Sequence, residues 1–66
     1  MGLLGKIMNR TTGLEINTNL ERINASSNWI LITVLDPKKN AKENIIKYCD
    51  LILEKANTIK QIVEKL

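Results

Sequence analysis

Cysteine and histidine set the first limits on the chemistry available to this chain. Cys49 is the only cysteine among 66 residues, and there is no histidine. An intramolecular disulfide therefore cannot form, and a zinc site of the usual cysteine and histidine type cannot be built. Without an imidazole, Cys49 has no neighbour to activate it as a nucleophile, and acid or base catalysis near neutral pH lacks its usual side chain.

The carboxylates give no better indication of a catalytic site. Asp36 stands where a helix would be capped, and Glu43, Asp50, Glu54 and Glu64 alternate with lysines in the way that is typical of a solvated helix face. No glycine-rich phosphate loop is present, since the three glycines fit no such motif. The sequence therefore predicts a protein that is not an enzyme and that uses no cofactor and no metal.

A cluster of lysines is the clearest charged feature in a chain of net charge +3. Lys38, Lys39 and Lys42 fall in the first turns of a predicted helix, where the macrodipole disfavours cations, and they are a candidate anion-binding site. A phosphate of a nucleic acid or an acidic protein patch would suit it. A solubilising cluster at a bend is the alternative, and the scarcity of aromatic and arginine residues favours it.

The element that carries these lysines is a long helix predicted over residues 37–65. Asp36 is a favoured N-cap and Pro37 suits the first helical position. Beyond Asn40 there is no glycine or proline. Apolar residues then alternate in steps of four and three, which is a heptad pattern, and they form the predicted oligomer interface: Ile45, Cys49, Ile52, Ala56, Ile59, Val63 and Leu66.

The apolar arc of this helix is too wide for one neighbouring helix to cover. Ile46 and Leu53 extend it on one shoulder, and Tyr48, Leu51 and Ile62 extend it on the other. A chain this short also buries only about 60% of the surface that its unfolded state exposes. Because disulfides and a zinc site are excluded, oligomerisation is the remaining way to stabilise it.

Residues 12–35 allow two interpretations. As a helix, Thr18 and Glu21 form a capping box, and Leu20, Ile23, Ser27, Ile30, Leu31 and Val34 share one face. As a β-hairpin, LEINTNL pairs with WILITVL, which is rich in β-branched residues. The unbroken run 29–35 would need cover on both faces of a strand, and one helix covers only one. This favours the helix.

The predicted fold is therefore all-α: an antiparallel helical hairpin with a long C-terminal amphipathic helix, completed by oligomerisation. The alternative is a ββα fold with a β-hairpin on the long helix. The chain is one small domain, in which residues 1–17 form an N-terminal segment with a short amphipathic start at residues 3–8. No export signal or membrane-spanning run is recognised, so a cytoplasmic protein is expected.

Trp29 and Ile32 form the candidate partner interface. In a helix over residues 18–35 they lie roughly opposite the Leu20 to Val34 stripe, and an exposed tryptophan beside an isoleucine is typical of an interaction hot spot. The alternative is that Trp29 covers the hairpin's own core.

Three classes of function follow from these features. The preferred one is a small non-enzymatic regulator, inhibitor or phage-type accessory protein that acts as a homo-oligomer and binds another protein. The second is a nucleic-acid-binding regulator that uses the lysine cluster, and the third is an assembly subunit or membrane-surface peptide. In length and helix number the expected hairpin resembles the small plasmid-encoded helical-hairpin dimers that form four-helix bundles and bind RNA loops, and no residue role is carried over.

Overall fold

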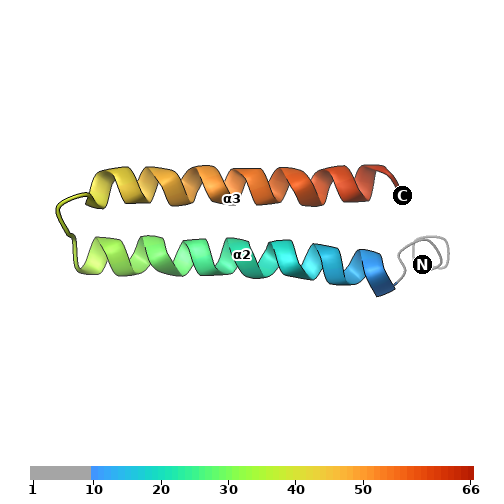
Figure 1. Cartoon of the computed structure of the whole chain (residues 1–66), viewed down its shortest axis with the longest axis horizontal. Coiled ribbons are helices and arrows are strands. Elements are labelled where there is room, and N and C mark those ends of the chain that lie inside the picture. The colour runs from blue at the N-terminus through green and yellow to red at the C-terminus, as the bar shows by residue number, and fades with distance from the viewer. Residues whose placement is uncertain (1–9) are drawn as a thin grey trace.

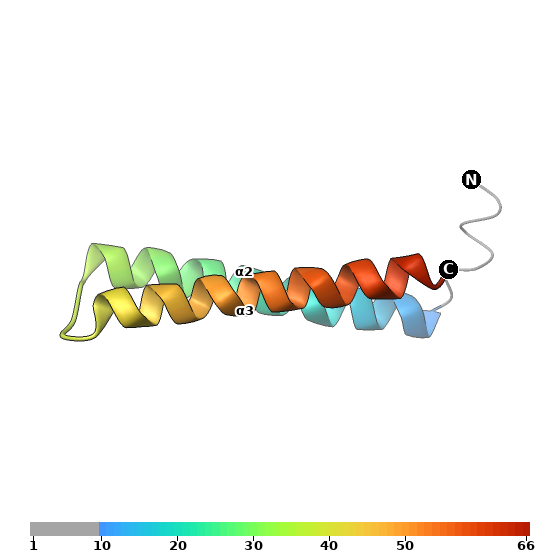
Figure 2. The same cartoon turned by 90° about the horizontal axis from the view of Figure 1, so that it is seen from above.

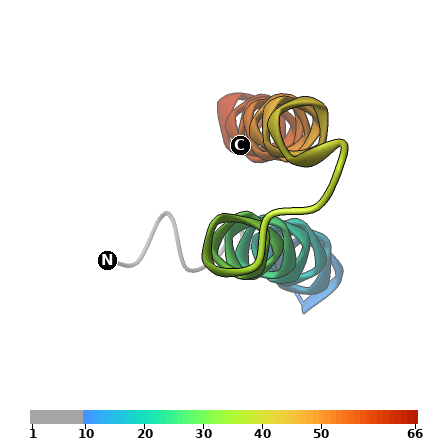
Figure 3. The ribbon, with the colours of Figure 1, turned by 90° about the vertical axis from the view of Figure 1, so that its left-hand side faces the viewer.

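The structure, a computed structural model, describes residues 10–66 as two antiparallel helices (Figure 1). Helix α2 spans Arg10–Leu35 and helix α3 spans Ala41–Glu64. The two helices pack against each other along their length, cross at a shallow angle (Figure 2) and lie side by side when viewed along their axes (Figure 3). The predicted all-α hairpin is confirmed, and the ββα alternative is wrong because WILITVL forms the last two turns of α2.

Helix α2 begins eight residues before the predicted start at residue 18. Thr18 does not act as an N-cap, because it lies inside the helix and its hydroxyl donates to the Leu14 carbonyl at 2.9 Å. Ser27 and Thr33 make the same bond to the carbonyls of Ile23 and Trp29, at 3.0 and 2.7 Å. These hydroxyls find acceptors within the helix, so they do not end it. The predicted amphipathic start at residues 3–8 lies outside the described residues.

The connection between the helices occupies residues 36–40, and α3 begins at Ala41 instead of Pro37. Asp36 directly follows the last residue of α2, and its backbone N–H still donates to the Ile32 carbonyl at 3.0 Å. Proline disfavours helical geometry in the residue before it, which explains why α2 ends here. Asn40 takes the N-cap position without a side-chain cap, and the expected capping role of Asp36 is wrong.

Half-buried residues mark the seam between the two helices, and they repeat in steps of four and three on both. None of the apolar residues from 10 to 66 is fully buried, and Ser26, 3% exposed, is the buried residue of this part of the chain. A small side chain at the centre of the seam lets the helices approach closely. The seam residues are Thr12, Ile16, Asn19, Ile23, Ser26, Ile30 and Thr33 of α2, and Ala41, Ile45, Tyr48, Ile52, Lys55, Ile59, Ile62 and Leu66 of α3.

Gly13 offers a direct test of the early start of α2. It lies within the helix, and a methyl group added to it would meet no atom within 4 Å. Because glycine lowers helix stability relative to alanine, Gly13→Ala should raise the free energy of unfolding by about 0.5 to 1 kcal/mol. Thermal unfolding followed by circular dichroism measures this. An unchanged or lower melting temperature would contradict a helix that extends through residue 13.

Candidate interaction surface

The α2 side of the seam is less than half apolar, which is unusual for a protein that relies on helix packing. Along α2, isoleucines alternate with small polar residues, so that each Ile16, Ile23 and Ile30 is followed by a polar seam position. The isoleucine side chains are half-buried, not enclosed. The contact between α2 and α3 therefore supplies a modest part of the burial that a stable fold needs.

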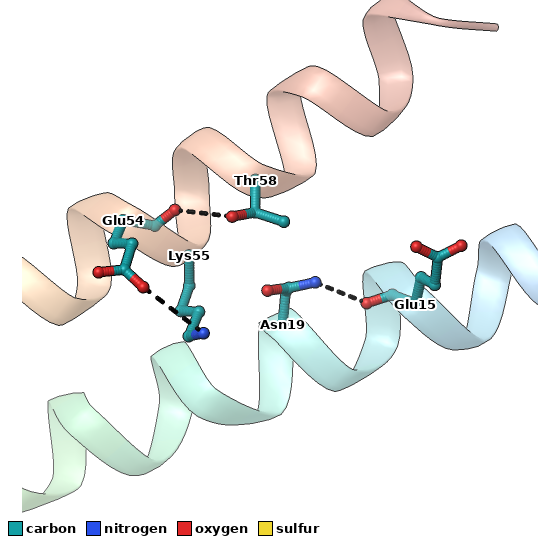
Figure 4. Close-up of polar contacts among 5 residues, drawn as sticks. All are labelled: Glu15, Asn19, Glu54, Lys55 and Thr58. Atoms are coloured by element: carbon teal, nitrogen blue, oxygen red, sulfur yellow. Dashed lines mark hydrogen bonds and ion pairs between the residues drawn. The ribbon is translucent and has the colours of Figure 1, made fainter.

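Polar side chains from both helices lie near the middle of the seam, and each of their contacts lies within one helix (Figure 4). The Asn19 amide donates to the Glu15 carbonyl at 2.8 Å, and the Lys55 ammonium lies 3.7 Å from a Glu54 carboxylate oxygen. The Lys55 side chain is 28% exposed, whereas that of Glu54 is 68% exposed. The Thr58 hydroxyl donates to the Glu54 carbonyl at 3.1 Å. Lys55 thus places a charge in the seam, where the other α3 positions are apolar.

Replacing this lysine is expected to stabilise the hairpin. Lys55→Leu removes a partly desolvated charge and adds apolar burial, so the free energy of unfolding should rise by about 1 to 2 kcal/mol. At about 4 to 8 °C per kcal/mol for a domain of this size, the melting temperature should rise measurably. Lys47→Leu, at an exposed position of the same helix, is the control. A fall in melting temperature with Lys55→Leu alone would show that the lysine supports the fold.

The predicted heptad of α3 is divided by the structure between two environments. Ile45, Ile52, Ile59 and Leu66 are half-buried in the seam, whereas the smaller members of the set are exposed. Tyr48 and Ile62, which the sequence placed on a shoulder of the apolar arc, lie in the seam instead of these smaller residues. The exposed members of the predicted oligomer interface are Cys49, Ala56 and Val63.

Helix geometry places these exposed residues together with apolar residues of α2. Each lies one position after a seam residue, and a right-handed helix turns by about 100° at each step. In two antiparallel helices, this rotation brings the positions that come one residue after the seam residues to the same side of the hairpin, on α2 and on α3 alike. We call this side the apolar face: Leu20, Leu31 and Val34 of α2 with Ile46, Cys49, Leu53, Ala56 and Val63 of α3.

Every residue of the apolar face is exposed in the hairpin. Leu53, near the middle of α3, is 68% exposed, and Leu31 is 56% exposed. The remaining positions on this side are uncharged except for Lys42 and Lys60, and they include no acidic residue. Exposed apolar side chains gathered on one side of a small protein are typical of an interaction surface.

The opposite side of the hairpin has a different character, and we call it the charged face. It is formed by the positions that precede the seam residues, and five of them are charged: Glu15, Arg22, Lys47, Glu54 and Lys65. Leu51 and Thr58 on this side are already half-buried. This distribution is that of a solvated surface, with Trp29 and Ile32 as its exposed apolar residues.

Trp29 and Ile32 therefore lie away from the apolar face, on the charged face. The Trp29 ring stacks on Tyr48 of α3, with 6.4 Å between ring centroids and 15° between the ring planes. Trp29 is still 52% exposed, and Ile32 is 50% exposed. The aromatic pair fixes one side of the Trp29 ring and leaves the rest of its surface available.

The predicted anion-binding lysines gather at the connection end of the hairpin. The Lys38 ammonium forms an ion pair with Asp36 at 3.3 Å, and both side chains are more than 70% exposed. Lys39 and Lys42 are exposed as well. Exposed pairs of this kind contribute little to stability.

Other kinds of site were sought in the same part of the chain. Residues 10–66 contain no group of three side chains able to hold a metal ion, and no pocket opens on their surface. Neither α2 nor α3 is apolar enough over a sufficient length to cross a bilayer. The apolar face is thus the main candidate site. Comparisons with protein-family models, curated proteins and solved structures found no match for this chain.

Proposed function

We propose that this protein is a small non-enzymatic interaction protein of the regulator or inhibitor type, which acts as a homo-oligomer and binds a protein partner. One observation supports this most directly. The helices described bury no hydrophobic residue fully between them, while eight apolar residues share one exposed side of the hairpin.

The energetics of so small a fold support self-association. Full burial of a leucine, isoleucine or valine side chain contributes about 1.5 to 3 kcal/mol relative to full exposure. Leu20, Leu31, Val34, Ile46, Leu53 and Val63 are each about half exposed or more. Burial of these six side chains by a second chain therefore contributes a free energy comparable to the free energy of unfolding of a small domain, which is about 5 to 15 kcal/mol.

A separate site for a second protein is supported by the position of Trp29. It lies with Ile32 on the charged face, so covering the apolar face leaves both exposed. Tryptophan is enriched among the residues that contribute most to protein–protein binding, and contact with Tyr48 holds this one in place. The arrangement gives the protein one side for its own copies and another for a partner.

Sedimentation equilibrium tests the self-association on which this proposal depends. The full chain should sediment as a dimer or larger oligomer at micromolar concentration, and its melting temperature should rise with concentration because association stabilises the folded state. A well-folded monomer at high micromolar concentration, with a melting temperature independent of concentration, would contradict the proposal.

A further inference from the structure

We infer that a second copy of the chain covers the apolar face in an antiparallel two-fold dimer, with the two basic connections at opposite ends. This inference rests on the proposed self-association and specifies its surface and its geometry. The connection is residues 36–40, and the dimer would be a four-helix bundle in which α3 packs on α3 of the second copy.

The dimensions of the hairpin suit a second copy. The described residues extend 50 Å by 17 Å by 15 Å, so one broad side has a projected area of about 850 Å². Stable interfaces bury about 800 Å² on each partner. A second hairpin has the same length and width, and can therefore cover the apolar face from end to end.

Two-fold symmetry leaves two ways to bring two apolar faces together. In one, the axis runs along the hairpins, both connections lie at the same end, and α3 packs on α2 of the other copy. In the other, the axis crosses the hairpins, the connections lie at opposite ends, and α3 packs on α3. Both are closed, isologous arrangements.

Charge distinguishes between these arrangements. Residues 36–42 carry three lysines and one aspartate, a net charge of +2, so connections at the same end would bring two such clusters together. The crossing axis separates them by the length of the hairpin. It also brings Lys42 to within one residue of the level of Glu64 in the second copy.

Full overlap of the two α3 helices fixes the register. Helix α3 spans Ala41–Glu64, so its midpoint lies between Ile52 and Leu53. Leu53 is the apolar-face residue next to that midpoint, and it therefore packs on its own counterpart at the axis. The smaller Cys49 and Ala56 lie on either side of it and allow close approach of the two helices.

The distance between the two connections is the decisive measurement. A spin label is attached to Lys39→Cys in a Cys49→Ala background, and label-to-label distances are measured by pulsed electron double resonance. The crossing axis predicts a distance of about 50 Å, the length of the hairpin. A distance of about 10 to 20 Å, one or two helix spacings, would place the connections together and overturn the inference.

The native cysteine gives an independent measure of which face is covered. Alkylation of Cys49 should slow at least tenfold as protein concentration rises through the dimer range. In Cys49→Ala/Gln61→Cys the single thiol lies on the charged face, and its alkylation rate should stay constant. A dimer in sedimentation whose Cys49 remains reactive would overturn the inferred face while leaving self-association intact, whereas a folded monomer would overturn both proposals.

Discussion

Replacing Leu53 with glutamate is expected to dissociate the proposed oligomer into monomers. In the inferred dimer Leu53 packs on its counterpart, so the substitution places two carboxylates at the axis and removes two apolar contacts. Burial of an unpaired charge and truncation of a buried leucine each cost several kcal/mol. The dissociation constant should therefore rise at least about 100-fold, which corresponds to about 2.7 kcal/mol. Sedimentation equilibrium measures it.

Ile32→Glu is the matched control, because it places the same charge at an exposed apolar position on the charged face. It should leave the dissociation constant within a few-fold of the wild type. Leu53→Ala should give an intermediate loss without an added charge, and this separates loss of the interface from loss of folding. Equal dimerisation of Leu53→Glu and the wild type would contradict the assignment of the apolar face.

Trp29→Ala is expected to weaken partner binding while leaving the dimer intact. The ring is half exposed on the charged face, and truncation of a hot-spot tryptophan costs more than about 2 kcal/mol, or roughly 30-fold in affinity. Helical circular dichroism and the dimer dissociation constant should change little, because Trp29 lies outside the apolar face. Quantitative recovery of the same host protein on immobilised wild-type and variant chains measures the difference.

The contact between Trp29 and Tyr48 supplies the control for this experiment. Trp29→Phe keeps an aromatic ring that can stack on Tyr48 and should retain part of the binding. Tyr48→Leu removes the stacking and keeps the tryptophan. If Trp29→Ala instead lowers the helical signal and the melting temperature strongly, the ring covers the hairpin's own core, and its role is structural.

The helical nature of the hairpin could be predicted from the sequence because it depends on local signals and on coverage. The run from residue 29 to 35 has no alternation, so it needs cover on both sides as a strand, and Pro37 separates the two helices. The residues at which the two helices begin were harder to predict from the sequence. Thr18 satisfies the pattern of a capping box equally well when its hydroxyl bonds to a carbonyl inside the helix, and Pro37 fits a connection as well as a first turn.

The sequence by itself determined that the chain forms helices and that neither an intramolecular disulfide nor a zinc site of the cysteine and histidine type can stabilise it. It also determined that α3 carries more apolar surface than one neighbouring helix can cover. Only the tertiary structure decided which part of that apolar surface stays exposed after α3 packs on α2. The apolar arc spans more than half of the helix, so several rotations of α3 bury similar areas and local pattern cannot choose among them. Packing against α2, with Tyr48 stacked on Trp29, selects the rotation that leaves Cys49, Leu53 and Ala56 exposed.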